Sequence, residues 1–369
     1  MTRKKPSAAA APRQGFWRGL VWWCATGSAL LLSACGLSTF VTPLRFPPLG
    51  VFVLTFPVWL AAATLFTLLA TALRTRRWWV PLVLLLLNAW AVRVYLPVNL
   101  PQEEPKGALT VLSYNTQNYA YHLHDDSAKV ALTRYIADSG ADIVCLQEAV
   151  RHDAYYRRTY LPILAERYAY SDSLEAEGSS FLNIYSRLPI VGRELVADGR
   201  GNKCMAFTLL DGADTLYVVN CHLRSMGLSL EEKAGFAGLV HDADTLTTGQ
   251  KRRESALLFT KIAAASVERA AQADRLCQYL ERRRGQRVIL CGDFNDTPIS
   301  YAHNRVASYL TDAYATTATG FGRSFNANSM LVRIDHMFCS EHYRPHACRV
   351  DQSVLYSDHY PIRCAFERR

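Results

Sequence analysis

The chain has 369 residues, so it can hold one large domain and a smaller unit, because a single hydrophobic core rarely grows beyond roughly 250–300 residues. Its formal net charge is +9. The whole excess lies in residues 1–107, where the only acidic residues are Glu103 and Glu104, and the rest of the chain is formally neutral. A basic surface that would bind nucleic acid along its backbone is therefore not indicated, and the charge instead flanks apolar segments.

Three apolar stretches lie in the N-terminal part: Leu20–Val41, Val51–Leu73 and Trp78–Leu96. Each is close to the roughly 20 residues that cross a bilayer as a helix. The third stretch is shorter and contains Asn88 and Arg93, and Arg93 is near enough to its end for the charge to reach the interface. The sequence thus predicts a basic cytoplasmic N-terminus over 1–19 and a membrane anchor with three transmembrane helices over 20–98.

Basic residues precede the first span, and Arg74, Arg76 and Arg77 follow the second. Loops rich in Lys and Arg stay in the cytoplasm, so three crossings place the remainder on the outer side, which in a bacterium is the periplasmic side of the inner membrane. Alternatively, Leu32–Cys35 resembles a lipoprotein cleavage box with an acylated Cys35, which leaves the remainder on the same side. The predicted partner of these helices is the lipid bilayer, and no protein partner can be inferred.

Residues 99–108 are polar and flanked by prolines, which predicts a linker before a domain over 109–369. Strands are predicted at Leu109–Tyr114, Ile143–Leu146, Phe181–Tyr185, Cys204–Leu210, Thr215–Cys221, Val288–Cys291, Ile334–Phe338 and Ile362–Phe366. Helices are predicted at Asp126–Ser139 and from about Lys251 to Arg284. Strands with few helices favour an α/β (α+β) sandwich, in which functional residues lie on loops at strand ends.

Acid, amide and imidazole side chains recur where these strands end: Asn115, Glu148, Asn220, His222, Asp293, Asn295, Asp335, Asp358 and His359. Any one of them alone would be explained as a turn or cap residue, but six such places in one domain are hard to explain by turns. Carboxylate and amide oxygens suit Mg²⁺ or Mn²⁺, and a further carboxylate can take a proton from water. Imidazoles can donate to phosphoryl oxygens. The pattern predicts a divalent-metal phosphate site.

These residues stand in six short motifs: Ser113-Tyr114-Asn115, Gln147-Glu148, Asn220-Cys221-His222-Leu223, Gly292-Asp293-Phe294-Asn295, Arg333-Ile334-Asp335 and Ser357-Asp358-His359. In order and spacing they resemble the endonuclease/exonuclease/phosphatase (DNase I-like) superfamily. With three N-terminal spans, the chain also resembles membrane proteins of Bacteroidetes-type bacteria. The resemblance implies a four-layered sandwich of two mixed β-sheets flanked by helices. It also implies Mg²⁺- or Mn²⁺-dependent cleavage of a P–O bond by in-line attack of water.

Carried over to this chain, the resemblance makes Glu148 the main metal ligand. Asn115 would lie beside it, and Asp358 would lie near or on the metal. Asp293 would orient or deprotonate the attacking water.

The same resemblance assigns the remaining residues to the phosphate. Asn295 would hydrogen-bond a phosphate oxygen, and Asp335 would fix His359. His359 and His222 would stabilise the developing negative charge. Asn220 could take over part of the role of His222.

Three readings of the function remain open at this point. The first is a nuclease-like phosphodiesterase, and the second is a lipid phosphodiesterase or phosphatase of the sphingomyelinase or phosphoinositide-phosphatase kind. The third is a catalytically silent binding domain that kept the fold. The substrate is thus expected to be a phosphate ester, either a nucleic acid or a lipid headgroup. Cys204 and Cys221 could lie on adjacent strands and form a disulfide, which the sequence does not decide. The long loop over Arg224–Gln250 is expected either to select substrate or to be disordered.

Overall fold

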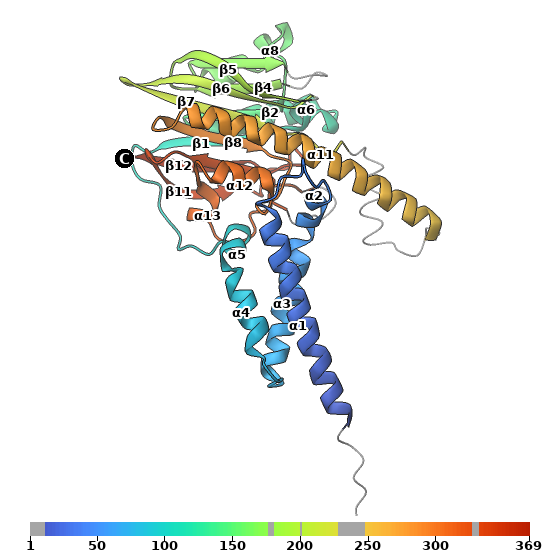
Figure 1. Cartoon of the computed structure of the whole chain (residues 1–369). Coiled ribbons are helices and arrows are strands. Elements are labelled where there is room, and N and C mark those ends of the chain that lie inside the picture. Colours follow the sequence, from blue (N-terminus) through green and yellow to red (C-terminus); the bar gives the residue numbers. More distant parts are fainter. Residues whose placement is uncertain (1–11, 176–180, 200, 228–247, 327–331) are drawn as a thin grey trace, which may run out of the picture.

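A computed structural model describes residues 12–175, 181–199, 201–227, 248–326 and 332–369. Two β-sheets pack face to face with helices on their outer sides, and a stalk of N-terminal helices extends from one side of this sandwich (Figure 1). The predicted four-layered fold and its two mixed sheets are confirmed.

The first sheet has the strand order β11-β12-β1-β2-β4-β3. Its strands are β1 (Leu109–Asn115), β2 (Ile143–Ala149), β3 (Tyr170–Glu175), β4 (Phe181–Ser186), β11 (Tyr343–Val350) and β12 (Ile362–Arg368). The central strands β1 and β2 run parallel, with Val111 opposite Ile143, and the other neighbours are antiparallel.

The second sheet has the order β5-β6-β7-β8-β10-β9. Its strands are β5 (Ile190–Asp198), β6 (Lys203–Asp211), β7 (Asp214–His222), β8 (Arg287–Asp293), β9 (Thr311–Asp312) and β10 (Asp335–Cys339). Here too the central pair, β7 and β8, is parallel. Because each central pair is parallel, its two strands end at the same edge of the sheet, and the polar residues that follow them are brought together.

Apolar side chains fill the space between the sheets, among them Val111, Ile184, Phe207, Val218 and Ile289. The outer face of the first sheet is covered by α7 (Asp126–Asp138), α8 (Ala154–Thr159) and α9 (Leu161–Ala165). The outer face of the second sheet is covered by α11 (Thr248–Arg282) and α12 (Tyr301–Ala307). Shorter helical turns are α6 (Gln117–Ala120), η2 (Tyr121–Leu123) and α13 (Ala313–Thr317).

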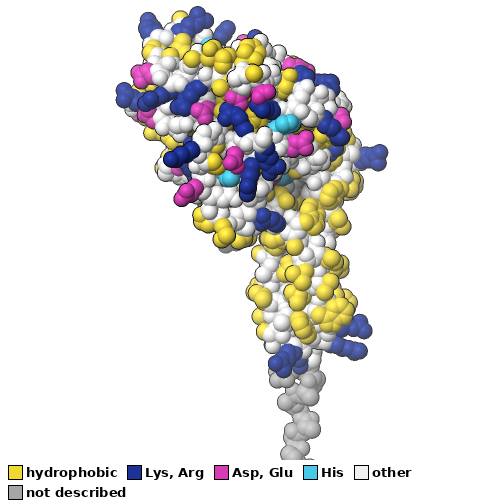
Figure 2. Space-filling view, turned by 90° about the vertical axis from the view of Figure 1, so that its left-hand side faces the viewer, with side chains coloured by type: hydrophobic (Ala, Val, Ile, Leu, Met, Phe, Trp, Pro, Cys, Tyr) yellow, Lys and Arg dark blue, Asp and Glu magenta, His cyan; other side chains and the backbone are white. Residues whose placement is uncertain are grey.

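The stalk consists of α1 (Pro12–Ser38), α2 (Leu49–Phe52), η1 (Val53–Thr55), α3 (Phe56–Ala72), α4 (Trp79–Leu87) and α5 (Ala89–Tyr95). Two helical segments, Gly15–Ser38 and Leu49–Ala72, are long and apolar enough to cross a membrane by length and composition. Hydrophobic side chains cover much of the stalk surface, as Figure 2 shows.

The third expected transmembrane helix is not a single helix, and the prediction of three such helices is corrected to two. The helix is interrupted at Asn88, between α4 and α5. The Asn88 side-chain amide donates hydrogen bonds to Ser33 Oγ on α1 (2.7 Å) and to the Leu84 carbonyl (2.8 Å). A side chain that bonds to backbone in this way competes with regular helix geometry, which accounts for the break.

Both apolar and polar contacts fasten the stalk to the sandwich. Ile299, in the loop after β8, is buried in the same apolar cluster as Ala29, Leu32 and Phe56 of the stalk. Arg333, just before β10, donates to the Val94 carbonyl of α5 (2.8 Å). The expected linker is also held against the domain.

Asn99 and Glu104 hold the linker against the domain. Asn99 donates to the carbonyls of Ala315 (3.1 Å) and Ala318 (2.5 Å), and Glu104 pairs with Arg349 and Arg363. The stretch 99–108 is thus an extended strap along the domain surface.

All eight predicted strands and both predicted helices of the domain are present, with ends shifted by a few residues. Cys204 and Cys221 lie opposite each other in the β6–β7 register, but all ten cysteines are free thiols. Most of the predicted loop over Arg224–Gln250, namely 228–247, lies outside the described residues.

Candidate active site

The ends of the four parallel strands form one polar edge of the sandwich. Asn115 closes β1, His222 closes β7 and Asp293 closes β8, while Glu148 is the last but one residue of β2. Segments far apart in sequence therefore meet at this edge.

Asp293 lies at the centre of the cluster and is almost fully buried. Its carboxylate accepts hydrogen bonds from Asn115 Nδ2 (3.0 Å), from the Asn295 backbone N–H (2.7 Å) and from Asn295 Nδ2 (3.1 Å). The Nε2 atoms of His222 and His359 are each 3.7 Å from Asp293 Oδ2. Burial raises the pKa of the Asp293 carboxyl to about 6, although the neighbouring His359 acts to lower it.

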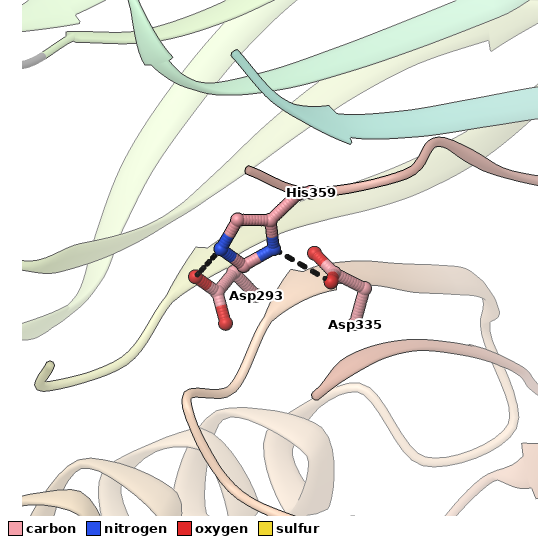
Figure 3. Close-up of side chains that lie close together, drawn as sticks. All are labelled: Asp293, Asp335 and His359. Carbon is pink, nitrogen blue, oxygen red and sulfur yellow. Dashed lines mark hydrogen bonds and ion pairs between the residues drawn. The ribbon is translucent and has the colours of Figure 1, made fainter. Parts of the chain in front are cut away.

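His359 and Asp335 form a buried pair beside Asp293, as Figure 3 shows. The distance from His359 Nδ1 to Asp335 Oδ2 is 2.8 Å. Burial alone would lower the pKa of the His359 imidazole, but the carboxylates of Asp335 and Asp293 raise it to about 10. Near neutral pH the imidazole is thus a cation held between two carboxylates.

Glu148 lies near Asp293 and is the more open carboxylate, with its side chain 28% exposed against 1% for Asp293. Its Oε1 is 3.3 Å from Asn115 Nδ2 and 3.7 Å from His222 Nε2. Asp358 is half-buried, and its backbone N–H donates to Gln117 Oε1 (3.1 Å). The structure therefore brings Glu148, Asn115 and Asp358 to the same edge as Asp293.

His222 and Asn220 differ in their surroundings. His222 is buried, and neither ring nitrogen has a hydrogen-bond partner among the described residues. A buried imidazole without a partner is costly, so this ring is available to a bound oxygen ligand. Asn220 instead donates to the carbonyls of Leu146 (3.1 Å) and Asn183 (3.2 Å), which joins the two sheets.

The backbone at this edge adopts uncommon conformations. Glu148 and Asn295 have φ values of 44° and 51°, in the left-handed region that few residues with side chains adopt. Gly292 has φ 141°, and a Cβ atom there would be 1.9 Å from the Cys221 carbonyl oxygen. Only glycine allows β8 to pass this close to β7 just before Asp293.

Comparison with family models identifies the family of this chain. Residues 112–359 match the model of the endonuclease/exonuclease/phosphatase family. The chain belongs to this family. It is accordingly a hydrolase that acts on phosphoester bonds. Residues 18–95 match a second family model, described as a domain of unknown function (DUF8431).

Several solved structures are similar to this phosphoesterase. The catalytic domain of human nocturnin with bound sulfate is 18% identical, with 72% of this chain and 96% of that chain covered and a TM-score of 0.49. D. rerio TDP2 complexed with a single-strand DNA product is 17% identical, with 71% and 100% covered and a TM-score of 0.48. Sphingomyelinase C from Streptomyces griseocarneus is 17% identical, with 71% and 100% covered and a TM-score of 0.47. No match is found among curated proteins.

Among the described residues, one group of side chains in the phosphoesterase has the spacing to hold a metal ion. The ligand atoms of Asp293, Asp335 and His359 lie within 4.8 Å of one another. Within this group, however, His359 Nδ1 and Asp335 Oδ2 already bond each other. Glu148 is more exposed, and His222 Nε2 lies 3.7 Å from its Oε1.

A polar network beneath the phosphoesterase site was not predicted from the sequence. Gln147 Nε2 donates to Asn220 Oδ1 (2.7 Å) and Ser113 Oγ (3.1 Å), and Asn183 Nδ2 donates to the Val150 carbonyl (2.9 Å). The available signal was an amide in the middle of the apolar stretch Phe181–Tyr185, where a buried polar group requires partners.

Proposed function

We propose that the chain is a divalent-metal-dependent phosphodiesterase, held at a membrane by its N-terminal helices, that cleaves a P–O bond by in-line attack of water. The observation that carries the proposal is the convergence on Asp293 of two imidazoles and two amides, with Glu148 beside them.

The charge of the edge supports a requirement for a cation. Four carboxylates, those of Glu148, Asp293, Asp335 and Asp358, lie near the two imidazoles of His222 and His359. Even with both imidazoles protonated, the site is formally negative, and a phosphate would add to this repulsion. Hard oxygen donors in a negative site suit Mg²⁺ or Mn²⁺, which Glu148, Asn115 and Asp358 would hold. When bound, the ion would polarise the phosphoryl group and offset the charge that develops on it.

The protein side chains have distinct roles in this proposal. Asp293 takes the proton of the attacking water, and a pKa near neutrality suits a general base. His222 donates to a phosphoryl oxygen through a ring nitrogen that has no other partner among the described residues. His359, kept protonated by Asp335, opposes the negative charge that grows in the transition state.

Asn295 and Asn220 act mainly by holding other parts of the site in position. Asn295 Nδ2 donates to Asp293 and to the Leu223 carbonyl (3.0 Å), which fixes the carboxylate of the base. Asn220 joins the sheets beneath His222. A bond from Asn295 to phosphate would require one of its present bonds to be exchanged.

A lipid phosphodiester is a second candidate substrate beside the nuclease-like one. The loop that follows Asn295 packs against the stalk through Ile299, and Arg333, two residues before Asp335, bonds to Val94 of α5. Both site segments therefore lie close to the outer end of the stalk, where a bilayer surface would be. The neutral catalytic domain, in contrast, lacks the excess positive charge typical of proteins that bind phosphate backbones.

Hydrolysis by the purified full chain in detergent tests the proposal. Plasmid DNA, RNA, vesicles with sphingomyelin or phosphoinositides, and inositol phosphates are supplied with Mg²⁺, Mn²⁺ or a chelator. We expect metal-dependent turnover of one substrate class that is lost in Asp293→Asn and kept in Asp214→Asn, an exposed surface control. Turnover that persists in chelator, or in Asp293→Asn, would refute the mechanism.

The location is tested separately with reporter fusions at the C-terminus. We expect activity of a reporter that works only outside the cytoplasm. Activity of a cytoplasmic reporter instead would refute the proposed periplasmic placement and leave the proposed hydrolysis untouched.

A further inference from the structure

A pocket of about 750 Å³ lies at the end of the stalk that is remote from the catalytic domain. It is formed by the first turns of α1 and by the turn between α3 and α4, and its lining comprises Gly15, Arg18, Gly19, Trp22, Trp23, Arg74, Thr75, Arg76 and Arg77. Dark-blue basic side chains gather at this end of the stalk in Figure 2. A Cβ atom added at Gly15 or Gly19 would meet no described atom within 4 Å outside its own stretch of helix, so these glycines leave the α1 side of the pocket open.

The turn that carries three of the arginines is held in an uncommon conformation. Arg74 and Arg77 have φ values of 47° and 59°, which residues with side chains seldom adopt. Helix α1 fixes this turn: Arg18 Nη2 donates to the carbonyls of Leu73 (2.5 Å) and Arg74 (2.7 Å), and Trp22 Nε1 donates to the Arg77 carbonyl (3.1 Å). Such conformations persist where the surroundings hold them, and they occur often at ligand clamps.

The positive charge of this pocket has no counter-charge in the stalk. The first 102 residues contain no Asp or Glu, and the catalytic domain lies at the other end. Four arginines therefore share one pocket without a carboxylate from the stalk, and their mutual repulsion favours an anion between them.

The aromatic residues indicate the depth of the pocket in a bilayer. Trp22 and Trp23 line the pocket, and Trp78 and Trp79 directly follow Arg77 in the sequence. Tryptophan is enriched at the level of lipid headgroups, where its ring is partly apolar and its N–H can reach a polar group. Exposed leucines cover the stalk beyond this level, for example Leu65, Leu68 and Leu69 of α3.

We propose that this pocket binds the phosphate of an anionic phospholipid from the membrane leaflet at that end of the stalk. Guanidinium groups match phosphate oxygens in bidentate geometry, and the acyl chains would lie along the apolar stalk. A zwitterionic lipid is disfavoured, because its own ammonium group would be repelled by the arginines. The inference rests on the membrane anchoring proposed above and is independent of the reaction at Asp293.

The test uses the purified full chain in mild detergent, with native mass spectrometry and thermal unfolding as readouts. Phosphatidylglycerol, phosphatidylcholine and inorganic phosphate are added separately at equal concentration. We expect retained phosphatidylglycerol and a raised melting temperature, with neither effect from the other two. In the double variant Arg76→Gln/Arg77→Gln, phosphatidylglycerol should bind about 30-fold more weakly, at roughly 1 kcal/mol for each arginine.

A matched control removes two arginines from the opposite end of the stalk, in Arg45→Gln/Arg93→Gln, and should bind phosphatidylglycerol like the wild type. Equal binding by the Arg76/Arg77 variant would overturn the proposal, as would equal stabilisation by phosphatidylcholine. Stabilisation by inorganic phosphate alone would show an adventitious ion only and would also overturn the lipid assignment. Hydrolysis measured on the same samples reports on the proposed function separately.

Discussion

Substitution of Asp335 by Asn probes the most unusual electrostatic feature of the site. The change keeps the size of the side chain and an oxygen that can accept from His359 Nδ1, which is 2.8 Å away, but removes the negative charge. The His359 imidazole is then left in a buried position with less compensation, so its pKa must fall from about 10.

The size of this fall can be worked out from the geometry. Two unit charges whose centres are roughly 4 Å apart interact by about 4 kcal/mol at an effective dielectric constant near 20, which corresponds to about three pKa units. His359 in Asp335→Asn should therefore titrate near pH 7. At pH 9 about 90% of the wild-type imidazole would be protonated but only about 1% of the variant, a difference of roughly 100-fold.

The assay is the ratio of wild-type to variant kcat/KM from pH 6 to pH 9 at saturating metal. The ratio cancels the pH-dependent terms that the substitution leaves unchanged. Any shift in the pKa of Asp293, which Asp335 raises and His359 lowers, acts at the low end of this pH range. It should rise steeply with pH, from a small value at pH 6 to about 100 at pH 9. A control, Glu367→Gln, removes the carboxylate beside His346 outside the site and should give a flat ratio. A flat ratio for Asp335→Asn would refute the role of His359 as a cation held by Asp335.

Three further changes test metal binding, burial and backbone geometry. Glu148→Gln should raise the Mg²⁺ concentration for half-maximal activity by at least about tenfold, and an unchanged metal requirement would exclude Glu148 as a ligand. Arg269→Met leaves the buried Asp296 without its partner at 3.0 Å and should cost about 3–5 kcal/mol in unfolding free energy. Adding Asp296→Asn should recover part of that loss, and no recovery would contradict the pairing. Gly292→Ala should cost at least about 3 kcal/mol or prevent folding, whereas a wild-type melting curve would contradict the tight approach to Cys221.

The strands that carry the site could be predicted because each is rich in apolar residues and buried on both faces, as β1 and β8 show. The strands that were missed lie toward the edges of the sheets. β3 is half-exposed and contains Ser and Asp, and β5 is largely exposed. β11 contains Pro345 and alternates buried with exposed residues. Such edge strands take their pairing from a neighbour, and little of that is visible in local sequence.

The site residues could be predicted as a set because strand ends placed them together, but their individual surroundings could not. Asn220 and His222 stand two residues apart on one strand, yet one joins the sheets and the other has free ring nitrogens among the described contacts. Arg269 lies in a long helix whose pattern shows only a buried face, and its partner Asp296 is 27 positions away. The break at Asn88 likewise depends on Ser33 of another helix.

The fastening of the stalk to the sandwich determines how the enzyme meets its substrate. Arg333 bonds to Val94, and Asn99 and Glu104 bond to the domain. These contacts hold the catalytic domain in one orientation relative to the stalk. With the stalk in a bilayer, the site would stay at one height and one tilt above the membrane plane. Encounters would then depend on lateral diffusion of the whole molecule and of membrane-bound substrates in two dimensions. A soluble polymer would have to come to the surface to be cut.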